Sequence, residues 1–82
     1  MSNIIYFVYI IECSDGSYYT GISHDIEKRI DRHNQGNGCE YTKNRRPVKL
    51  LYSEKCNSYQ AAFIREKEIK GWRREKKERL FK

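Results

Sequence analysis

The sequence lacks the features that mark membrane-bound and secreted proteins. It has no apolar run near the roughly 20 residues that a membrane-spanning helix needs. Met1 is followed by Ser2 and Asn3, not by the basic segment that opens a secretion signal. We therefore expect a cytoplasmic protein with no membrane partner.

Cysteine is scarce, and its spacing argues against a disulfide framework. Cys13, Cys39 and Cys56 are odd in number and widely separated, which is typical of reduced thiols. A zinc site that combined them with His24 or His33 is disfavoured, because the sequence contains no Cys-x-x-Cys pair.

Hydrophobic residues are also few, at 38% against 34% charged residues. They nevertheless occur in periodic runs, which favours a compact fold over disorder. The 82 residues leave room for one domain, which we assign to 1–82 and expect to be monomeric. No repeat, low-complexity tract or linker interrupts it.

What the sequence has in excess is positive charge, with a net value of +6. The segment 70–82 has seven basic residues and two acidic ones, and the segment 43–49 is also rich in lysine and arginine. This distribution favours a polyanionic partner, either nucleic acid or an anionic membrane surface. A solvated face that keeps the chain soluble explains the charge nearly as well, so charge alone does not decide.

The segment 6–23, YFVYIIECSDGSYYTGIS, predicts a β-hairpin that holds four of the seven tyrosines. A two-residue turn would place Tyr9 and Tyr19 on opposite faces. A three-residue loop with Gly16 in the left-handed conformation would place them on the same face. The phenols would then be diagonal neighbours about 7 Å apart, beside a notch at Gly21 that would admit a phosphate.

A helix is predicted over 23–36, with Ser23 or Asp25 as its N-cap and a glycine as its stop. Two isoleucines one turn apart form its apolar stripe. Arg29 and His33 flank that stripe, so we expect both at the edge of the core.

A third strand is predicted at 48–53, followed by a helix that Asn57 or Ser58 opens and Gly71 ends. A short basic helix then follows, anchored by Trp72, Leu80 and Phe81.

On a helical wheel, one face of the longer helix gathers the following apolar residues: Tyr59, Ala62, Phe63 and Ile69. Glu66 falls in the middle of this face. Because burying an unpaired carboxylate is costly, Glu66 is predicted to be ion-paired, exposed at a rim or bound to a metal.

Taken together, FVY and YTG on a hairpin, an arginine eight residues after the glycine and a glutamate on a later helix resemble the GIY-YIG nuclease family. The resemblance runs from Ile4 to Phe81 and is greatest to small stand-alone members. It implies an α+β fold with a three-stranded antiparallel sheet flanked by helices, which agrees with the order β-β-α-β-α-α. It also favours the same-face register of the two tyrosines.

By position, the resemblance assigns five catalytic residues: Tyr9, Tyr19, Arg29, His33 and Glu66. Gly21 matches the glycine of the second motif. Two features depart from relatives in the family: Ile22 stands where repair-type members have a lysine, and no asparagine follows Asn57.

The implied function is that of a magnesium-dependent (or manganese-dependent) DNA endonuclease, structure- or weakly sequence-selective, in repair or recombination. RNA stays open as a substrate, and no small-molecule cofactor is expected. Glu66 would hold the metal and Arg29 would clamp the phosphate. Tyr9 is assigned to the base side and Tyr19 to a phosphate or metal-bound water, with a nearby cation or His33 lowering the phenol pKa from about 10.

Further contacts to nucleic acid are expected from residues with cationic, hydroxyl or aromatic side chains in the loop and the tail. These are Tyr41, Thr42, Lys43, Arg45, Arg46, Lys70, Arg73 and Arg74. The backbone at Gly21 on the hairpin is expected to make a further contact. The other large aromatics of the sheet and tail, Tyr18, Tyr52 and Trp72, are expected to fill the core or its edge.

Ordinary structural roles are the alternatives. The tyrosines would be sheet aromatics, Arg29 would pair with Asp25, His33 would cap its helix and Glu66 would pair with Lys70. At the level of function, the alternatives are a nucleic-acid-binding module with little or no turnover and a charge-rich interaction domain at a membrane surface.

Overall fold

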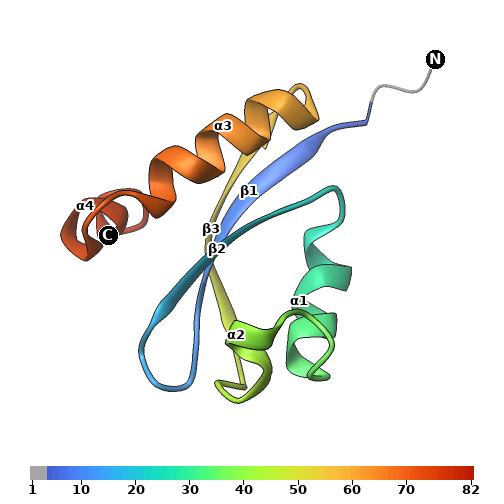
Figure 1. The fold of residues 1–82 in the computed structure, drawn as a ribbon, viewed down its shortest axis with the longest axis vertical. Helices are drawn as coiled ribbons and strands as arrows, with labels where there is room; N and C mark the ends of the chain where they lie inside the picture. Colours follow the sequence, from blue (N-terminus) through green and yellow to red (C-terminus); the bar gives the residue numbers. More distant parts are fainter. Residues whose placement is uncertain (1–3) are drawn as a thin grey trace.

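The computed structural model describes residues 4–82; the three residues before them, on which the expected lack of a secretion signal partly rests, lie outside the described residues. The strands are β1 (Tyr6–Glu12), β2 (Tyr18–Ser23) and β3 (Lys49–Cys56) (Figure 1). The helices are α1 (Ile26–Asn34), α2 (Glu40–Lys43), α3 (Tyr59–Lys70) and α4 (Arg74–Glu78). The predicted order is confirmed, with the short α2 added in a segment expected to be a loop.

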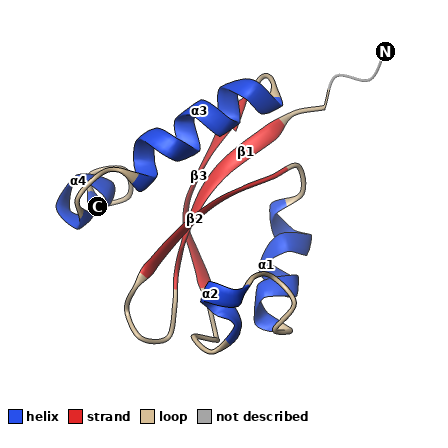
Figure 2. Ribbon diagram, in the orientation of Figure 1, coloured by secondary structure: helices blue, strands red, loops and turns tan. Residues whose placement is uncertain are grey.

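The three strands form an antiparallel sheet in the order β2-β1-β3, so β1 is central. Helix α3 covers one face of the sheet, and α1 and α2 lie on the other (Figure 2). The predicted fold class is confirmed. The edge strand β2 borders both helical layers, which places it beside any site built between α1 and α3.

Strand β1 is buried on both faces, as its continuous apolar run predicts. Val8 and Ile10 pack toward α3, where Ala62 and Ile69 complete a cluster of fully buried side chains. The intervening side chains of β1 point the opposite way. They form a second cluster on the face that carries α1.

The hairpin adopts the register that places both tyrosines on one face. Gly16 has φ +85°, and β1 pairs with β2 so that Tyr9 lies opposite Gly21 and Ile11 opposite Tyr19. The ring centroids of Tyr9 and Tyr19 are 6.5 Å apart. The three-residue loop therefore sets the geometry of the site, because a shift of one residue would send one phenol to the other face.

The helix boundaries follow local capping signals. The side chains of Asp25 and Ser58 accept hydrogen bonds from the backbone of the first turns of α1 and α3, and Gly71 caps the end of α3. Two predicted N-caps, Asp25 and Ser58, are thus confirmed over their alternatives. No helix within residues 4–82 is long and apolar enough to span a membrane.

The expected apolar face of α3 is only partly correct. Ala62 and Ile69 are fully buried, but Tyr59 and Phe63 are 51% and 40% exposed. The buried stripe turns toward the sheet, and the two aromatic rings flank it at its solvent-facing edge. The aromatic side chains expected at the core, Tyr18, Tyr52 and Trp72, do pack against it, together with Leu80 and Phe81.

Candidate active site

A cleft of about 500 Å³ runs along β2 between α1 and α3. It brings together four of the five predicted catalytic side chains, Tyr9, Tyr19, Arg29 and Glu66, and the backbone of Gly21. They come from the consecutive elements β1, β2 and α1 and from α3, which is distant from these in sequence. The fold therefore gathers the predicted residues into one place.

Tyr9 is the most buried of these residues, at 1% exposure. Its ring lies over Gly21, where an added Cβ would come within 2.5 Å of the Tyr9 hydroxyl oxygen. The sequence predicted that a notch at Gly21 would admit a phosphate. This prediction is wrong, because the Tyr9 phenol fills the notch. Only glycine leaves the space that this ring needs.

His33 is buried at 1% exposure behind Tyr9, deeper than its expected place at the core edge. Its Nε2 lies 2.9 Å from the Tyr9 hydroxyl, and its Nδ1 lies 2.7 Å from Thr42 Oγ1. Burial, with the nearby charges of Arg29 and Arg32, lowers the pKa of His33 from its usual value, so the ring is neutral at pH 7.

The hydrogen bonds around His33 assign the proton of the neutral ring to Nδ1. Thr42 Oγ1 donates to the carbonyl of Cys39 at 3.4 Å, which leaves its lone pairs to accept from Nδ1–H of His33. Nε2 of His33 is then free to accept from the Tyr9 hydroxyl. The resulting chain runs from Tyr9 through His33 to Thr42.

Two further positions border this series of hydrogen bonds, and the sequence analysis gave neither of them a role there. An added Cβ at Gly38 would come within 2.1 Å of His33 Nδ1, so a side chain there would displace the ring. Cys39 lies beside both Thr42 and Tyr19. Burial raises the pKa of its thiol, but hydrogen bonds with these two side chains and with the backbone of Thr42 and Tyr41 lower that pKa overall. Neither position belongs to a recognisable motif, and only the folded loop reveals them.

Tyr19 is held among other rings at the mouth of the cleft. Its centroid is 5.5 Å from that of His33 and 5.7 Å from that of Tyr41, which stacks against it. Burial and the hydrogen bond to Cys39 raise the pKa of Tyr19 to about 12.

The two phenols are therefore neutral in the free protein. Burial, followed by the proximity of Tyr19, raises the pKa of Tyr9 well above its usual value, and this outweighs the lowering by Arg29. Arg29 lowers the pKa of both phenols, as expected, but not enough to bring either pKa below its usual value. Tyr9 instead has a hydrogen-bond acceptor within reach, His33, to which its proton can pass.

Helix α1 supplies a basic wall to the cleft. Arg29 lines it together with Lys28 and Arg32, both of which the sequence analysis missed. Their spacing of three and four residues was a usable signal, since such positions share one helix face. Asp25, the alternative ion-pair partner of Arg29, instead caps the helix by accepting from the Lys28 amide.

Helix α3 supplies the opposite wall. Tyr59 and Phe63 are stacked with centroids 6.2 Å apart, and Tyr6 meets Tyr59 edge to face. All three line the cleft. Sequence reasoning missed Tyr6 and placed the other two in the core, because helical periodicity does not show where the buried stripe stops.

Glu66 lies on the same wall with its side chain 16% exposed, and Lys70 Nζ approaches its Oε2 at 3.3 Å. The ion-pair alternative for Glu66 is thus observed. Within residues 4–82, no three carboxylate, histidine or cysteine side chains converge as a metal cluster. A single carboxylate beside an open cleft still fits a magnesium ion that keeps most of its waters, since magnesium accepts one protein carboxylate plus substrate phosphate.

Most of the residues expected to bind nucleic acid lie outside the cleft, and several are already engaged. Thr42 is fully buried against His33, so it is not available to a phosphate, and this prediction is wrong. Arg45 and Arg46 donate to Asp15 and to backbone carbonyls. Arg74 lies over the Tyr18 ring and donates to the Gly16 carbonyl. Lys43 and Arg73 are exposed, and their contacts with nucleic acid stay a prediction.

The arrangement described above, phenols and a guanidinium facing a carboxylate beside a three-stranded sheet, is suited to binding and cleaving a phosphodiester. Comparison with known proteins gives the same class: the GIY-YIG catalytic domain matches residues 5–79. The chain therefore belongs to the GIY-YIG family, whose members are nucleases. Within that family it is similar to small proteins known as UPF0213.

Two relatives illustrate the similarity. A UPF0213 protein of Staphylococcus aureus strain Mu50 is 52% identical over 77 residues, which cover 94% of each chain. The solution NMR structure of a UPF0213 protein from Bacillus halodurans is 42% identical to this chain. It matches with a TM-score of 0.59 over 93% of this chain and 81% of that one.

Proposed function

We propose that this protein is a divalent-metal-dependent endonuclease that hydrolyses phosphodiester bonds of DNA in the cleft between α1 and α3. The observation that carries the proposal is the convergence of Tyr9, Tyr19, Arg29 and Glu66 in that cleft. We further propose that selection is by DNA structure or weakly by sequence, as in repair or recombination.

The basic wall of α1 would bind the substrate. The Arg29 guanidinium offers several N–H donors to the phosphoryl oxygens, and it is preorganised where negative charge develops during hydrolysis. Lys28 and Arg32 would hold the flanking phosphates. Tyr19, neutral because of its raised pKa, would turn its hydroxyl proton from Cys39 to a phosphoryl oxygen when substrate binds.

Proton transfer would run through Tyr9 and His33. As water attacks phosphorus and the P–O bond to the leaving oxygen breaks, the Tyr9 oxygen takes a proton from the water while its own proton passes to Nε2 of neutral His33. The leaving oxygen takes its proton from solvent water. His33 becomes charged, and Nδ1–H keeps its bond to Thr42. Glu66 would hold a divalent ion, which supplies Lewis acidity toward the phosphate when bound.

A second candidate is a nucleic-acid-binding module with little or no turnover. It is favoured by the ion pair of Glu66 with Lys70 and by Ile22, which occupies the position of a lysine in repair-type relatives. In this case the cleft would bind phosphates through α1 without the carboxylate taking part.

Incubation of the protein with supercoiled plasmid, single-stranded DNA, branched DNA and RNA would test the proposal, each with Mg²⁺, with Mn²⁺ and with EDTA. We expect metal-dependent cleavage of at least one DNA, abolished by EDTA. Salt-sensitive binding of the same substrates with no cleavage under any condition would favour the binding module.

A further inference from the structure

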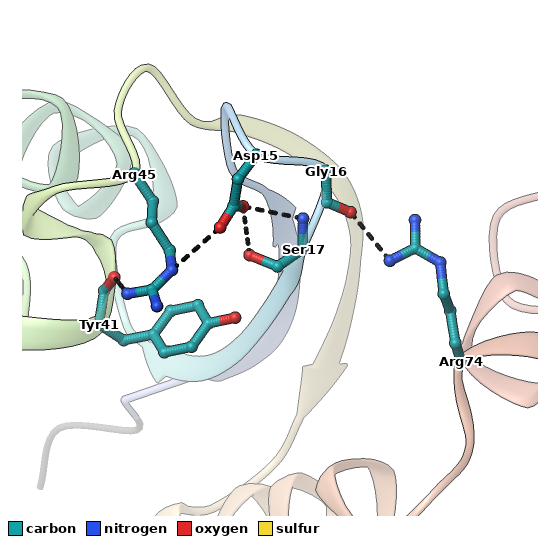
Figure 3. A network of polar contacts seen from close by, with 6 residues as sticks. All are labelled: Asp15, Gly16, Ser17, Tyr41, Arg45 and Arg74. Atoms are coloured by element: carbon teal, nitrogen blue, oxygen red, sulfur yellow. Dashed lines mark hydrogen bonds and ion pairs between the residues drawn. The ribbon is translucent and has the colours of Figure 1, made fainter.

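A chain of contacts connects the turn of the hairpin to the phenol at the mouth of the cleft. Arg45 Nε donates to Asp15 Oδ2 at 3.1 Å, and Arg45 Nη1 donates to the carbonyl of Tyr41 at 2.6 Å (Figure 3). The guanidinium also lies 4.2 Å from the centroid of the Tyr41 ring. Tyr41 in turn stacks on Tyr19, with 27° between the ring planes.

Asp15 and Tyr19, the first and last residues in this series of contacts, belong to the same hairpin. Asp15 is fixed in the turn by accepting from both the amide and the hydroxyl of Ser17 (Figure 3). The amide of Ser14 donates to the carbonyl of Arg45 at 2.8 Å, which attaches the loop after α2 to the turn a second time. Tyr19 follows the turn on β2. The stacking of Tyr41 on Tyr19 therefore connects α2 to this strand.

The arrangement of Tyr41 and Arg45 is explained better by these contacts within the protein than by contact with nucleic acid. Neither residue lines the cleft. The Arg45 side chain is 38% exposed and makes an ion pair and a backbone hydrogen bond. One face of the Tyr41 ring is covered by Tyr19, and the guanidinium of Arg45 lies over it as well.

We propose that Tyr41 is a positioning residue for Tyr19, held in place by Arg45 on Asp15. Its ring limits the Tyr19 side chain to the orientation that faces the cleft. The inference rests on the proposed function for its catalytic consequence, but the positioning itself is a property of the protein without substrate. Misplacing a reacting group by about 1 Å lowers rates by up to about 100-fold, so the effect on turnover is measurable.

The test compares Tyr41→Ala, which removes the stacked ring, with Tyr41→Phe, which keeps it. Relaxation of the ¹³C-labelled Tyr19 ring, measured by NMR on the folded protein without substrate, reports its order. We expect the order parameter to fall below about 0.6 in Tyr41→Ala and to stay near the wild-type value in Tyr41→Phe. An unchanged order parameter in a folded Tyr41→Ala variant would overturn the proposal.

Kinetics then separate positioning from substrate contact. We expect Tyr41→Ala to lower kcat by about tenfold or more with KM nearly unchanged, and Tyr41→Phe to restore kcat. A raised KM at unchanged kcat would instead make Tyr41 a direct contact to nucleic acid and contradict the proposal. If the wild type cleaves nothing, the proposed function fails, while the NMR result still decides whether Tyr41 orders Tyr19.

A second pair of variants tests the contact between Asp15 and Arg45, where this series of contacts begins. Asp15→Asn keeps the acceptor for Ser17 and removes the charge that Arg45 contacts, whereas Glu40→Gln removes an exposed charge on α2 outside the chain. We expect Asp15→Asn to lower kcat by about two- to fivefold, the range of an exposed ion pair, and Glu40→Gln to leave it unchanged. Equal effects of the two variants would contradict transmission through Arg45.

Discussion

The hydroxyl of Tyr9 donates to a neutral histidine, and this pairing governs what the phenol can do. Burial raises the pKa of this phenol and the nearby Arg29 does not offset it, so the hydroxyl keeps its proton in the free protein. The 2.9 Å bond to His33 gives that proton a destination that does not depend on ionising the free phenol. We therefore propose that Tyr9 and His33 act together as the unit of proton transfer.

The neutral state of buried His33 makes a prediction for stability. Its folded pKa is lowered, so the unfolded chain takes up the proton first as the pH falls below about 6.5. The free energy of unfolding should therefore decrease between pH 7 and 5, by at most about 1.4 kcal/mol per pH unit. Urea unfolding across this range measures it. His33→Gln, which cannot be protonated, should show a shallower slope, and equal slopes would contradict the assignment.

Tyr9→Phe removes only the hydroxyl that bonds to His33. We expect kcat for DNA cleavage to fall by about 100-fold or more, the usual range for loss of a general base, with DNA affinity retained. Tyr52→Phe is the matched control, because the Tyr52 hydroxyl donates to Glu54 and lies outside the cleft. Single-turnover kinetics measures both, and a Tyr9→Phe rate equal to that of Tyr52→Phe would exclude the base role.

The elements around the site are packed so tightly that one added carbon at Gly21 or Gly38 would displace the Tyr9 or His33 ring. β2 approaches the Tyr9 ring at Gly21, and the loop before α2 approaches His33 at Gly38. These contacts depend on hydrogen-bonded backbone in the sheet and the loop, which cannot shift cheaply. The backbone of β2 and of the loop before α2 therefore fixes the positions of the Tyr9 and His33 rings.

Gly21→Ala tests this packing. The added methyl would lie 2.5 Å from the Tyr9 hydroxyl oxygen, so we expect the free energy of unfolding to fall by about 1–3 kcal/mol, as overpacking usually costs. Gly71→Ala is the control, since its added carbon would meet nothing closer than 3.5 Å and its φ of −80° suits alanine. Chemical denaturation measures both. Equal stability of the two variants would mean that Tyr9 can move aside.

The elements that the sequence predicted well are those with local signals. The hairpin was predicted from the turn residues Asp15 and Gly16 and from the apolar run before them. The sequence allowed two strand registers, and the left-handed conformation of Gly16 selects one of them. The burial of Thr42 and the contacts of Arg45 were missed, because they depend on how the segment between α1 and β3 folds back on the hairpin. That path is set by contacts between residues far apart in sequence, which no periodicity records.

For the whole molecule, the net charge of +6 is less informative than where the charges are engaged. In the tail, Arg74 and Lys82 pair with Glu78, so part of the basic excess there is internally compensated. The basic wall of α1 faces an open cleft. The composition predicted a polyanionic partner, and we propose that its main contacts lie on this wall rather than in the tail.

The salt dependence of DNA binding tests this relocation. We expect affinity to fall steeply with salt, and Arg32→Met on the basic wall to reduce the slope of log K against log salt by about 1, the loss of one phosphate contact. Lys49→Met, outside this cleft, is the control and should leave the slope unchanged. Fluorescence anisotropy with a labelled oligonucleotide measures both. A slope unaffected by Arg32→Met would remove α1 from the binding surface.

The most direct test of the central claim, that this cleft hydrolyses DNA, compares two charge-matched variants of α3. Glu66 lines the cleft, and Glu68, two residues further along, does not. In plasmid nicking with Mg²⁺, we expect Glu66→Gln to lose about 100-fold or more of the wild-type rate with DNA binding retained, and Glu68→Gln to keep that rate. Nicking by Glu66→Gln at the wild-type rate would contradict the claim.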